Sequence, residues 1–524
     1  MRRYFLFPFF LAAAATALAA TCQDLSLLKL PGVTITSAAE VPAAAGQARL
    51  PAYCQAKGYV TTPGLHGEPA NQVHFELDLP TTGWNGKLYF AGGGGFVAGR
   101  SNKAVLAQGY ASAYTDAGHE NPSAFDATWA GNSLTRKVDF FYRGIHVATV
   151  AAKAITRAFY DKPLQRAYFV GCSTGGRQAM MEAQRFPEDY DGIVAGAPAV
   201  DFTGLMLEFS WNQRALLASA ASYIPASKLP LIAKAVLAEC DARDGLADGL
   251  IGDPRKCRFD PASLLCRAGE AKDCLSAAQV DTLRKLYAGP STSSGRQIFP
   301  GMPMGHEDTP NYAAYVFGNT PPVAQPDGSL TYTGDYIRNS TVAALEFEFQ
   351  EQFLRYEAFR TGNAAYDWRT FNFDKNPEKV ADLAKLHNAL DPDLSRFRKR
   401  GGKLILYNGW SDPVVPPVRI VQYYEKVESV MGPERTRDFA RLFMAPGMNH
   451  CGGGPGPNSF DSLGALDRWV EQGAAPDQMV ASHSSNRVAD RTRPLCPHPQ
   501  VAKWKGAGSI DEAANFECAA PEKK

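Results

Sequence analysis

The pattern of apolar and polar positions changes twice along the chain. From about residue 70 to residue 200, short apolar runs that suit buried strands alternate with segments of helical apolar spacing. Strands that alternate with helices predict a mostly parallel sheet with helices on both faces. We expect strands within 74–80, 86–95, 108–119, 166–171 and 190–199, and helices at 144–160 and 175–187.

The regular alternation stops at about residue 201 and returns near residue 396. The stretch between them is rich in proline, aromatic residues and loops, and it holds four cysteines. Beyond it we expect strands within 403–407 and 439–450 and helices at 418–431 and 461–473. The sequence therefore predicts one α/β domain, residues 20–200 and 396–524, interrupted by an insertion at 201–395. A large insertion beside the carboxyl edge of a sheet would act as a lid over the site.

The first 19 residues have the composition of a secretory signal peptide. Two arginines precede an apolar stretch, and Ala17-Leu18-Ala19 fits a cleavage site. The alternative is a membrane anchor, for which the apolar run is short. No later segment is apolar enough to span a membrane, so we expect a soluble protein that is secreted or periplasmic. The 54 basic and 53 acidic residues form no basic stripe, which argues against nucleic acid as a partner. The oligomeric state is left open.

A serine motif follows the predicted strand at 166–171. Gly171-Cys172-Ser173-Thr174-Gly175 matches Gly-x-Ser-x-Gly, and a helix is expected directly after it. A nucleophile elbow requires this strand–turn–helix context, because the tight turn projects the hydroxyl and crowds its neighbours. The alternative is a serine that caps a helix beside incidental glycines.

A base and an acid are expected further along the chain, in the order Ser, Asp, His. His450 ends a predicted strand and precedes three glycines, and Asp412 lies just past the strand at 403–407. Asp412 would orient His450, and His450 would move the proton of Ser173. The alternative for Asp412 is an Asx turn before Pro413. His483 and His498 lie in polar tail segments and are expected at the surface.

Two backbone N–H groups are expected to form an oxyanion hole. One belongs to Thr174, and the other to the glycine run 92–95, from which Gly93 and Gly94 are named as candidates although the sequence leaves open which of the four donates. The alternative for this run is a flexible loop without a role.

Ten cysteines in an exported chain predict up to five disulfides, although the sequence alone cannot choose the pairing. Nearness along the chain suggests Cys22–Cys54, Cys240–Cys257, Cys266–Cys274 and Cys496–Cys518. Cys172 and Cys451 are then left, and they flank the expected nucleophile and base. A bond between them would staple the two loops together, and in the chain-entropy model it would stabilise the fold by about 5 kcal/mol.

A loop after Cys240 carries four aspartates among glycines: Asp241, Asp244, Asp248 and Asp253. Clustered carboxylates repel one another unless a cation neutralises them, and oxygen ligands suit Ca²⁺. The spacing is not that of an EF-hand. The alternative is a solvated acidic turn.

These features together resemble the tannase and feruloyl esterase family of secreted α/β-hydrolases, which also contains mono(2-hydroxyethyl) terephthalate hydrolases. The family's mark is a Cys-Ser, Asp, His-Cys arrangement with the two cysteines bonded, matched here by Cys172-Ser173, Asp412 and His450-Cys451. The segments "GWNGKLYFAGGGG", "DGIVAGAPA" and "PGMNHCGGGPG" also look like family segments.

The resemblance implies an α/β-hydrolase fold with a lid domain and a structural calcium ion in the lid. It implies the five cysteine pairs named above, carboxylate ligands from Asp241, Asp244 and Asp248, and carbonyl ligands from Leu246 and Leu250. No organic cofactor is implied.

The resemblance does not fix the substrate. Terephthalate-monoester hydrolases bind the free carboxylate with a lid arginine, and the segment 305–320 has none. Arg355 is a substitute candidate, with a surface helix arginine as the alternative. We therefore expect a serine carboxylesterase acting on small esters of phenolic acids. The alternatives are a terephthalate-monoester hydrolase, a serine peptidase or a non-catalytic binding protein.

Overall fold

The structure is a computed structural model that describes residues 20–44, 50–120, 123–267, 273–334 and 343–521. The expected signal peptide, residues 1–19, lies outside the described residues. Within the described part of the chain, no helix is long and apolar enough to cross a membrane.

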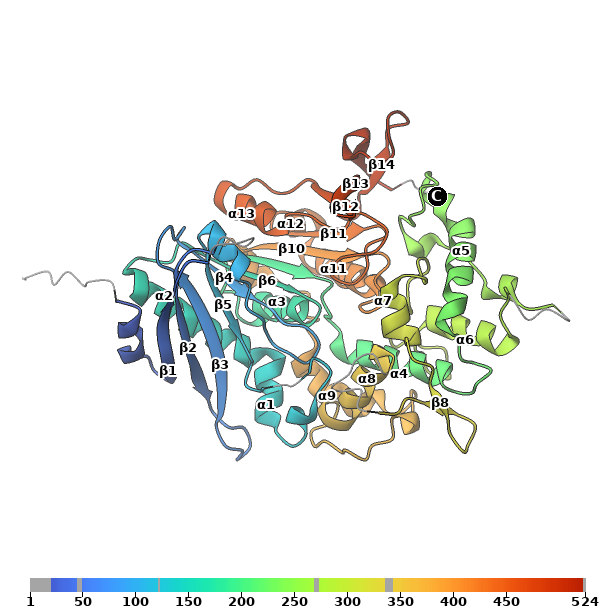
Figure 1. Cartoon of the computed structure of the whole chain (residues 1–524), viewed down its shortest axis with the longest axis horizontal. Helices are drawn as coiled ribbons and strands as arrows, with labels where there is room; N and C mark the ends of the chain where they lie inside the picture. Colours follow the sequence, from blue (N-terminus) through green and yellow to red (C-terminus); the bar gives the residue numbers. More distant parts are fainter. Residues whose placement is uncertain (1–19, 45–49, 121–122, 268–272, 335–342, 522–524) are drawn as a thin grey trace, which may run out of the picture.

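A nine-stranded sheet runs through the protein in the order β1-β2-β3-β5-β4-β6-β7-β10-β11 (Figure 1). The pairs from β5 to β11 are parallel, whereas β1, β2, β3 and β5 pair antiparallel with one another. The bounds are β1 Val33–Val41, β2 Tyr53–Thr62, β3 Asn71–Pro80, β4 Lys87–Ala91, β5 Ala111–Thr115, β6 Arg166–Cys172, β7 Gly192–Gly196, β10 Lys403–Gly409 and β11 Ala440–Ala445.

The predicted mostly parallel sheet is confirmed, and each expected strand range overlaps one of its strands. The pattern did not indicate β1 and β2, which extend the sheet on its antiparallel side.

Helices cover both faces of the sheet, and successive side chains of one strand serve opposite faces. Phe169 of β6 packs in the core with α2, α3 and α11, whereas Tyr168 packs with α13 on the other face. The main helices of this domain are α1 Leu134–Val138, α2 Gly144–Tyr160, α3 Thr174–Arg185, α10 Ser395–Lys399, α11 Pro417–Met431, α12 Pro433–Arg437 and α13 Ser462–Gln472.

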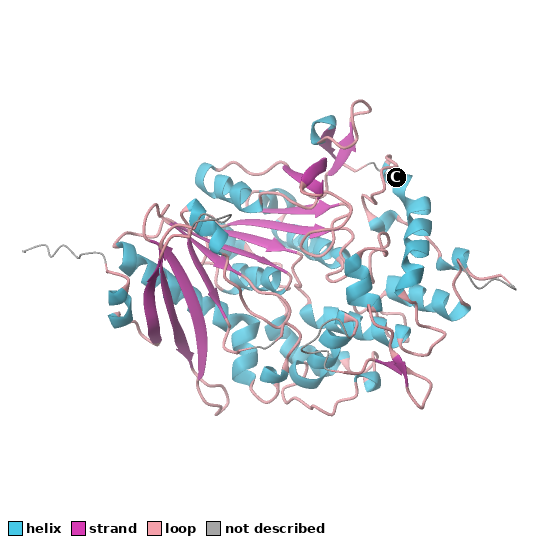
Figure 2. Cartoon of the chain, viewed as in Figure 1, coloured by secondary structure: helices cyan, strands magenta, loops and turns pink. Residues whose placement is uncertain are grey.

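The insertion, residues 201–395, leaves the sheet after β7 and returns to it at β10. It is mainly helical (Figure 2), and its short strands β8 Val323–Ala324 and β9 Leu330–Thr331 pair only with each other in the described residues. Its core, which includes Phe209, Leu283 and Phe347, is continuous with residues of the α/β domain such as Phe96 and Phe140. Its helices are α4 Phe202–Leu216, α5 Leu229–Cys240, α6 Ala277–Ala288, α7 Pro310–Tyr312, α8 Leu345–Gln352 and α9 Pro377–His387, with π-helical turns η9 Ala313–Phe317 and η10 Phe353–Glu357.

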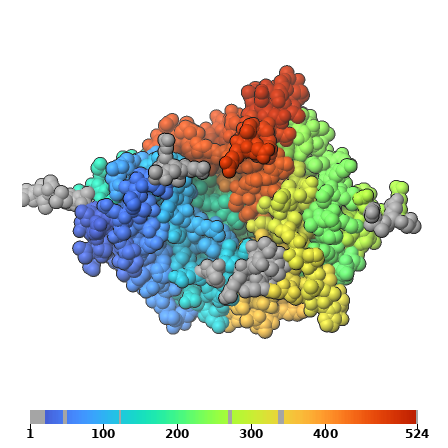
Figure 3. All heavy atoms as spheres, viewed as in Figure 1, coloured from blue at the N-terminus to red at the C-terminus, as the bar shows by residue number. Residues whose placement is uncertain are grey.

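The C-terminal segment forms two small hairpins, β12 Met479–Ser485 with β13 Val488–Leu495 and β14 Val501–Trp504 with β15 Phe516–Ala519. In the space-filling view the first strands lie on the left, the insertion on the right and the C-terminal segment at the top (Figure 3).

Five disulfides join the cysteines of the chain, and no free cysteine is found in the described residues. The pairs are Cys22–Cys54, Cys172–Cys451, Cys240–Cys257, Cys266–Cys274 and Cys496–Cys518, the same pairs that nearness and the family resemblance predicted.

Candidate active site

Ser173 occupies the turn between β6 and α3. Its backbone has φ 63° and ψ −123°, a conformation that L-residues other than glycine rarely adopt. The serine side chain makes no capping bond to the helix, so the helix-cap interpretation lacks its hydrogen bond. Glycines are required around it, because a Cβ at Gly171 would lie 2.5 Å from the backbone of Gly175. This strained turn leaves the hydroxyl free to act as a nucleophile.

Asp412 and His450 lie in the loops after β10 and β11, which pair in parallel. The carboxyl ends of both strands therefore meet at the sheet edge where β6 delivers Ser173. His450 Nδ1 lies 2.9 Å from Asp412 Oδ2. Because an ionised carboxylate only accepts, this contact places the ring proton on Nδ1 and leaves Nε2 as the acceptor.

Asp412 is fully buried and uses both carboxylate oxygens. Its Oδ1 accepts the N–H groups of Val414 at 2.8 Å and Val415 at 3.0 Å, while Oδ2 bonds His450. Asp412 therefore has both of the roles considered from the sequence: Oδ1 closes an Asx turn, and Oδ2 bonds the catalytic histidine candidate. The turn fixes the carboxylate, and the carboxylate fixes the imidazole.

The disulfide Cys172–Cys451 connects the serine loop to the histidine loop. Its S–S distance is 2.02 Å and its Cα atoms are 6.0 Å apart. Because Cys172 precedes Ser173 and Cys451 follows His450, the bond holds these two residues' backbones close together. The structure thus assembles the predicted Ser, His and Asp at one sheet edge.

The glycine run after β4 packs directly on the serine turn. Gly175 N–H donates to Gly93 O at 3.0 Å, and the Thr174 hydroxyl donates to Gly95 O at 2.7 Å. The N–H groups of the two predicted donors are already engaged. Gly93 donates to Gln178 Oε1 and Gly94 to Val97 O, both at 3.0 Å.

Two N–H groups at this turn are differently placed. Within the described part of the chain we find no acceptor for the N–H of Thr174 or for that of Gly95. Gly95 has φ +59°, and a Cβ there would lie 2.4 Å from Ala124 O, so the position requires glycine. The arrangement can therefore offer two free donors beside Ser173.

Tyr315 of η9 brings the insertion against this edge. Its ring centroid is 6.3 Å from that of His450, in an edge-on arrangement. Burial, followed by the nearby carboxyl groups of Asp412 and Glu348, raises the pKa of Tyr315 to about 12. Neither Tyr315 nor Glu348 was a sequence candidate, since an aromatic or acidic residue in an irregular segment gives no signal of its neighbours.

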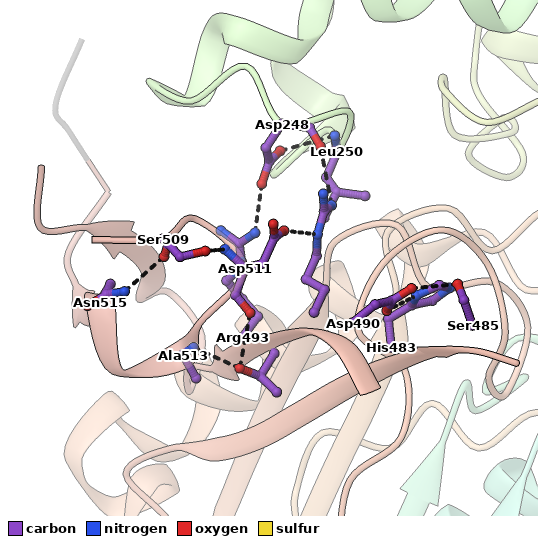
Figure 4. A network of polar contacts seen from close by, with 12 residues as sticks. Asp248, Leu250, His483, Ser485, Asp490, Arg493, Ser509, Asp511, Ala513 and Asn515 are labelled. Carbon is purple, nitrogen blue, oxygen red and sulfur yellow. Dashed lines mark hydrogen bonds and ion pairs between the residues drawn. The ribbon is translucent and has the colours of Figure 1, made fainter. Parts of the chain in front are cut away.

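The remaining sequence candidates lie elsewhere. Arg355 Nη2 pairs with Glu351 Oε1 at 2.9 Å, so its guanidinium already has an anionic partner. His483 Nδ1 lies 2.6 Å from Asp490 Oδ1, a pair shown in Figure 4. The prediction that His498 is a surface residue was wrong. Its side chain is 10% exposed and contacts Glu425, and burial lowers its pKa.

The aspartate loop is ordered mainly by its own backbone. Asp241 accepts the N–H groups of Asp248 and Gly249, and Asp244 accepts those of Leu246 and Gly252. Burial, together with the charges of Asp248 and Asp241, raises the pKa of Asp244 to about 6. This electrostatic conflict is one that a bound cation would relieve.

The same loop is tied to the C-terminal segment (Figure 4). Asp248 Oδ2 accepts from Arg493 Nη2 at 2.7 Å, and both side chains are almost fully buried. Arg491 donates to the Asp248 carbonyl at 3.2 Å and pairs with Asp511 at 2.8 Å. The loop of the insertion is therefore fastened to β13.

The oxygen chemistry of this loop fits a hard cation, but its carboxylates are not drawn together as a ligand set. Among the described residues, three acidic or histidine ligand atoms all lie within 4.8 Å of one another only at His146, Glu182 and Asp189. Burial there raises the pKa of Glu182 well above its usual value, and the neighbouring Asp189 charge raises it further. In that cluster His146 Nδ1 lies 2.6 Å from Asp189 Oδ2, and neither oxygen of Glu182 has a hydrogen-bond partner among the described residues.

Comparison with known proteins gives the site a context. Residues 54–519 match the family model described as "Tannase and feruloyl esterase". The chain belongs to the tannase and feruloyl esterase family. It is 38% identical to an uncharacterised esterase of Xanthomonas campestris pv. campestris, with 95% of this chain and 91% of that protein covered. It is 34% identical to the mono(2-hydroxyethyl) terephthalate hydrolase of Piscinibacter sakaiensis, with coverage of 92% and 87%.

Solved structures agree with this membership. Feruloyl esterase B from Aspergillus oryzae superposes with a TM-score of 0.79 at 26% identity, covering 95% of this chain and all of that one. Tannin acyl hydrolase from Aspergillus niger gives a TM-score of 0.75 at 21% identity, covering 95% of each chain. The predicted α/β-hydrolase fold and the predicted family are thereby confirmed, and the protein is a carboxylic ester hydrolase.

Proposed function

We propose that this family member is a serine esterase that hydrolyses small esters of aromatic, phenolic acids through an acyl-enzyme. Ser173 attacks the ester carbonyl, His450 takes its proton and returns it to the leaving alcohol, and Asp412 orients and stabilises the imidazolium. The observation that carries this proposal is the strained Ser173 turn, disulfide-linked to the loop of a histidine whose Nδ1 lies 2.9 Å from Asp412.

We place the oxyanion hole at the N–H groups of Thr174 and Gly95. Both lie at the serine turn and lack acceptors in the described residues, whereas the N–H groups of Gly93 and Gly94 are engaged. Thr174 is the donor expected from the sequence, whereas Gly95 takes the place of the candidates Gly93 and Gly94. Donors aimed at the developing negative charge stabilise the tetrahedral intermediate in a site that water does not compete for.

The aromatic substrate class is supported by the relatives and by the residues of the insertion. Feruloyl esterase B and tannin acyl hydrolase are names of structural neighbours, and Tyr315 presents an aromatic edge to His450. The insertion would act as a lid that supplies this contact. Terephthalate-monoester hydrolysis is the second candidate, because a relative bears that name. It is disfavoured because Arg355, the candidate for binding a second carboxylate, pairs with Glu351.

We further propose a structural calcium ion in the aspartate loop. Asp241, Asp244 and Asp248 would supply carboxylates, and Leu246 and Leu250 would supply carbonyls. Oxygen donors and the raised pKa of Asp244 support this assignment. The ion would have to draw the three carboxylates together, in competition with the loop N–H groups and Arg493. It would neutralise charge and join the insertion to the C-terminal segment.

We also propose that the N-terminal segment directs export of the protein, which agrees with its five disulfides.

The decisive assay of function is a panel of methyl ferulate, methyl gallate, chlorogenate, mono(2-hydroxyethyl) terephthalate and a matched amide of ferulic acid. We expect the highest kcat/KM on methyl ferulate, methyl gallate or chlorogenate, and no hydrolysis of the amide. Preference for the terephthalate monoester would select the second candidate, and amide cleavage would indicate a peptidase.

A further inference from the structure

Glu348 of α8 is a buried carboxyl group without a partner among the residues that the structure describes. Its residue is 0% exposed, and neither side-chain oxygen has a hydrogen-bond partner among the described residues. Two other acidic residues of the same helix are bonded. Glu346 accepts from Asn212 and Gln213, and Glu351 pairs with Arg355. Burying an unpaired polar group destabilises a fold, so such a group calls for an explanation.

The position of α8 connects Glu348 to the reaction centre. The helix packs against η9, which carries Tyr315, and the Tyr315 ring lies 6.3 Å from the His450 ring. The carboxyl groups of Asp412 and Glu348 both raise the Tyr315 pKa, so this phenol is close to both of them.

The other side of α8 reaches the oxyanion loop. Phe349, adjacent to Glu348, packs 5.5 Å from Phe96 and 4.8 Å from Phe125 between ring centroids. Phe96 directly follows Gly95. Helix α8 therefore lies between the element that contacts the base and the loop that offers the oxyanion donor, in aromatic surroundings suited to an aromatic acyl group.

The chemistry of Glu348 restricts what it can bind. Burial raises its pKa to about 9, so at neutral pH it is a carboxylic acid with one O–H donor and a carbonyl acceptor. A phenolic hydroxyl both donates and accepts, and so it satisfies both functions. A ligand carboxylate only accepts hydrogen bonds, and its negative charge would be repelled by that of Asp412 nearby. Arg355, which could neutralise that charge, is paired with Glu351.

We propose that Glu348 binds a hydroxyl group on the aromatic ring of the acyl group, and so selects hydroxylated aromatic acids over O-methylated or carboxylated ones. This inference rests on the proposed esterase function, and it adds the residue that reads the ring. Glu348 acts in specificity by touching the substrate and has no part in proton transfer.

The test compares two esters that differ at one oxygen: methyl ferulate, with a free 4-hydroxyl, and methyl 3,4-dimethoxycinnamate, in which it is methylated. A hydrogen bond to a buried group discriminates by about 1–3 kcal/mol, or roughly 5- to 150-fold in kcat/KM. We expect wild type to prefer methyl ferulate within this range. Glu348→Leu should lower kcat/KM on methyl ferulate by a similar factor and leave the dimethoxy ester nearly unchanged.

Two further variants complete the design. Glu348→Gln keeps a donor and an acceptor, so it should retain most of the preference. Glu351→Gln changes another buried acid of α8, one bonded to Arg355, and should keep the wild-type ratio. The ratio of the two esters within one preparation does not depend on how much enzyme is folded.

Equal loss on both esters in Glu348→Leu, or loss of the preference in Glu351→Gln but not in Glu348→Leu, would overturn the proposal. A wild type without preference would overturn it as well. Failure of the proposed function looks different, because the wild type would then hydrolyse neither ester.

Discussion

The sheet edge that carries Ser173, Asp412 and His450 and the helix α8 that faces it differ in how they treat buried polar groups. At the sheet edge, both oxygens of Asp412 are bonded and a disulfide joins the two flanking loops. In α8, and within the described residues, Glu348 is buried without a partner and Glu346 accepts hydrogen bonds from the neutral amides of Asn212 and Gln213. A bonded network fixes geometry, which the chemical step requires. An unpaired group keeps its bonding capacity for a ligand, which selection requires.

The largest effect should come from removing the nucleophile. Ser173→Ala should lower kcat by at least about 10³-fold while leaving the fold intact, because only binding and the oxyanion hole remain. Esterase kinetics and circular dichroism of the same preparation check this. Retention of a tenth of the wild-type kcat would place the nucleophile elsewhere.

The second largest effect should come from the oxyanion loop, where substitutions test whether Gly95 or Gly94 supplies the N–H donor. Gly95→Ala should lower kcat by about 10²- to 10³-fold, because its Cβ would meet Ala124 O at 2.4 Å and displace the donor. Gly94→Ala is the matched control, since a Cβ there meets nothing within 4 Å. KM should change little in either. If Gly94→Ala were the more damaging substitution, the assignment to Gly95 would be wrong.

The disulfide is the third way to loosen the bonded edge. The double variant Cys172→Ala, Cys451→Ala should lose kcat by about a hundredfold at temperatures where circular dichroism still reports a native fold, because a ~1 Å misplacement of nucleophile and base costs that much. The variant Cys266→Ala, Cys274→Ala removes a disulfide of the insertion and should affect stability alone. An equal loss of kcat in both would contradict a positioning role for Cys172–Cys451.

The smallest effect concerns the aspartate loop. Chelation should lower the Tm by several degrees and spare kcat at low temperature, since an ion bound only to the folded state stabilises it. Asp241→Asn should abolish this sensitivity to chelator. Asp253→Asn should keep it, because Asp253 is bonded to Arg255 outside the proposed ligand set. Calorimetry with and without added Ca²⁺ gives the readout, and an identical Tm in both would refute the calcium site.

The same contrast explains what could be predicted from the sequence. Ser173, Asp412 and His450 could be predicted because an elbow needs a strand, glycines and a helix in a fixed order, and these leave a local pattern. The parallel strands could also be predicted from their apolar pattern, whereas that pattern did not indicate β1 and β2. Gly95 could not be separated from Gly93 and Gly94, because their acceptors, Gln178 and Val97, are known only from tertiary structure and turn geometry.

The insertion was the least predictable part. In "LEFEFQEQ" nothing local distinguishes Glu348, for which the described residues offer no partner, from Glu346 and Glu351, which have one. The partners Asn212 and Gln213 come from α4, about 130 residues earlier in the chain. His498 was misjudged for the same reason, since it packs against Tyr424 and Glu425 of α11, which the polar tail around it does not indicate.

One measurement tests the central claim, that the bonded sheet edge is an activated serine site, most directly. The protein is treated with a fluorophosphonate, digested, and mapped by mass spectrometry. The account predicts one adduct, on the peptide that contains Ser173, with no labelling in Ser173→Ala and slow labelling in His450→Ala. An adduct on another residue, or equal labelling of wild type and Ser173→Ala, would contradict it.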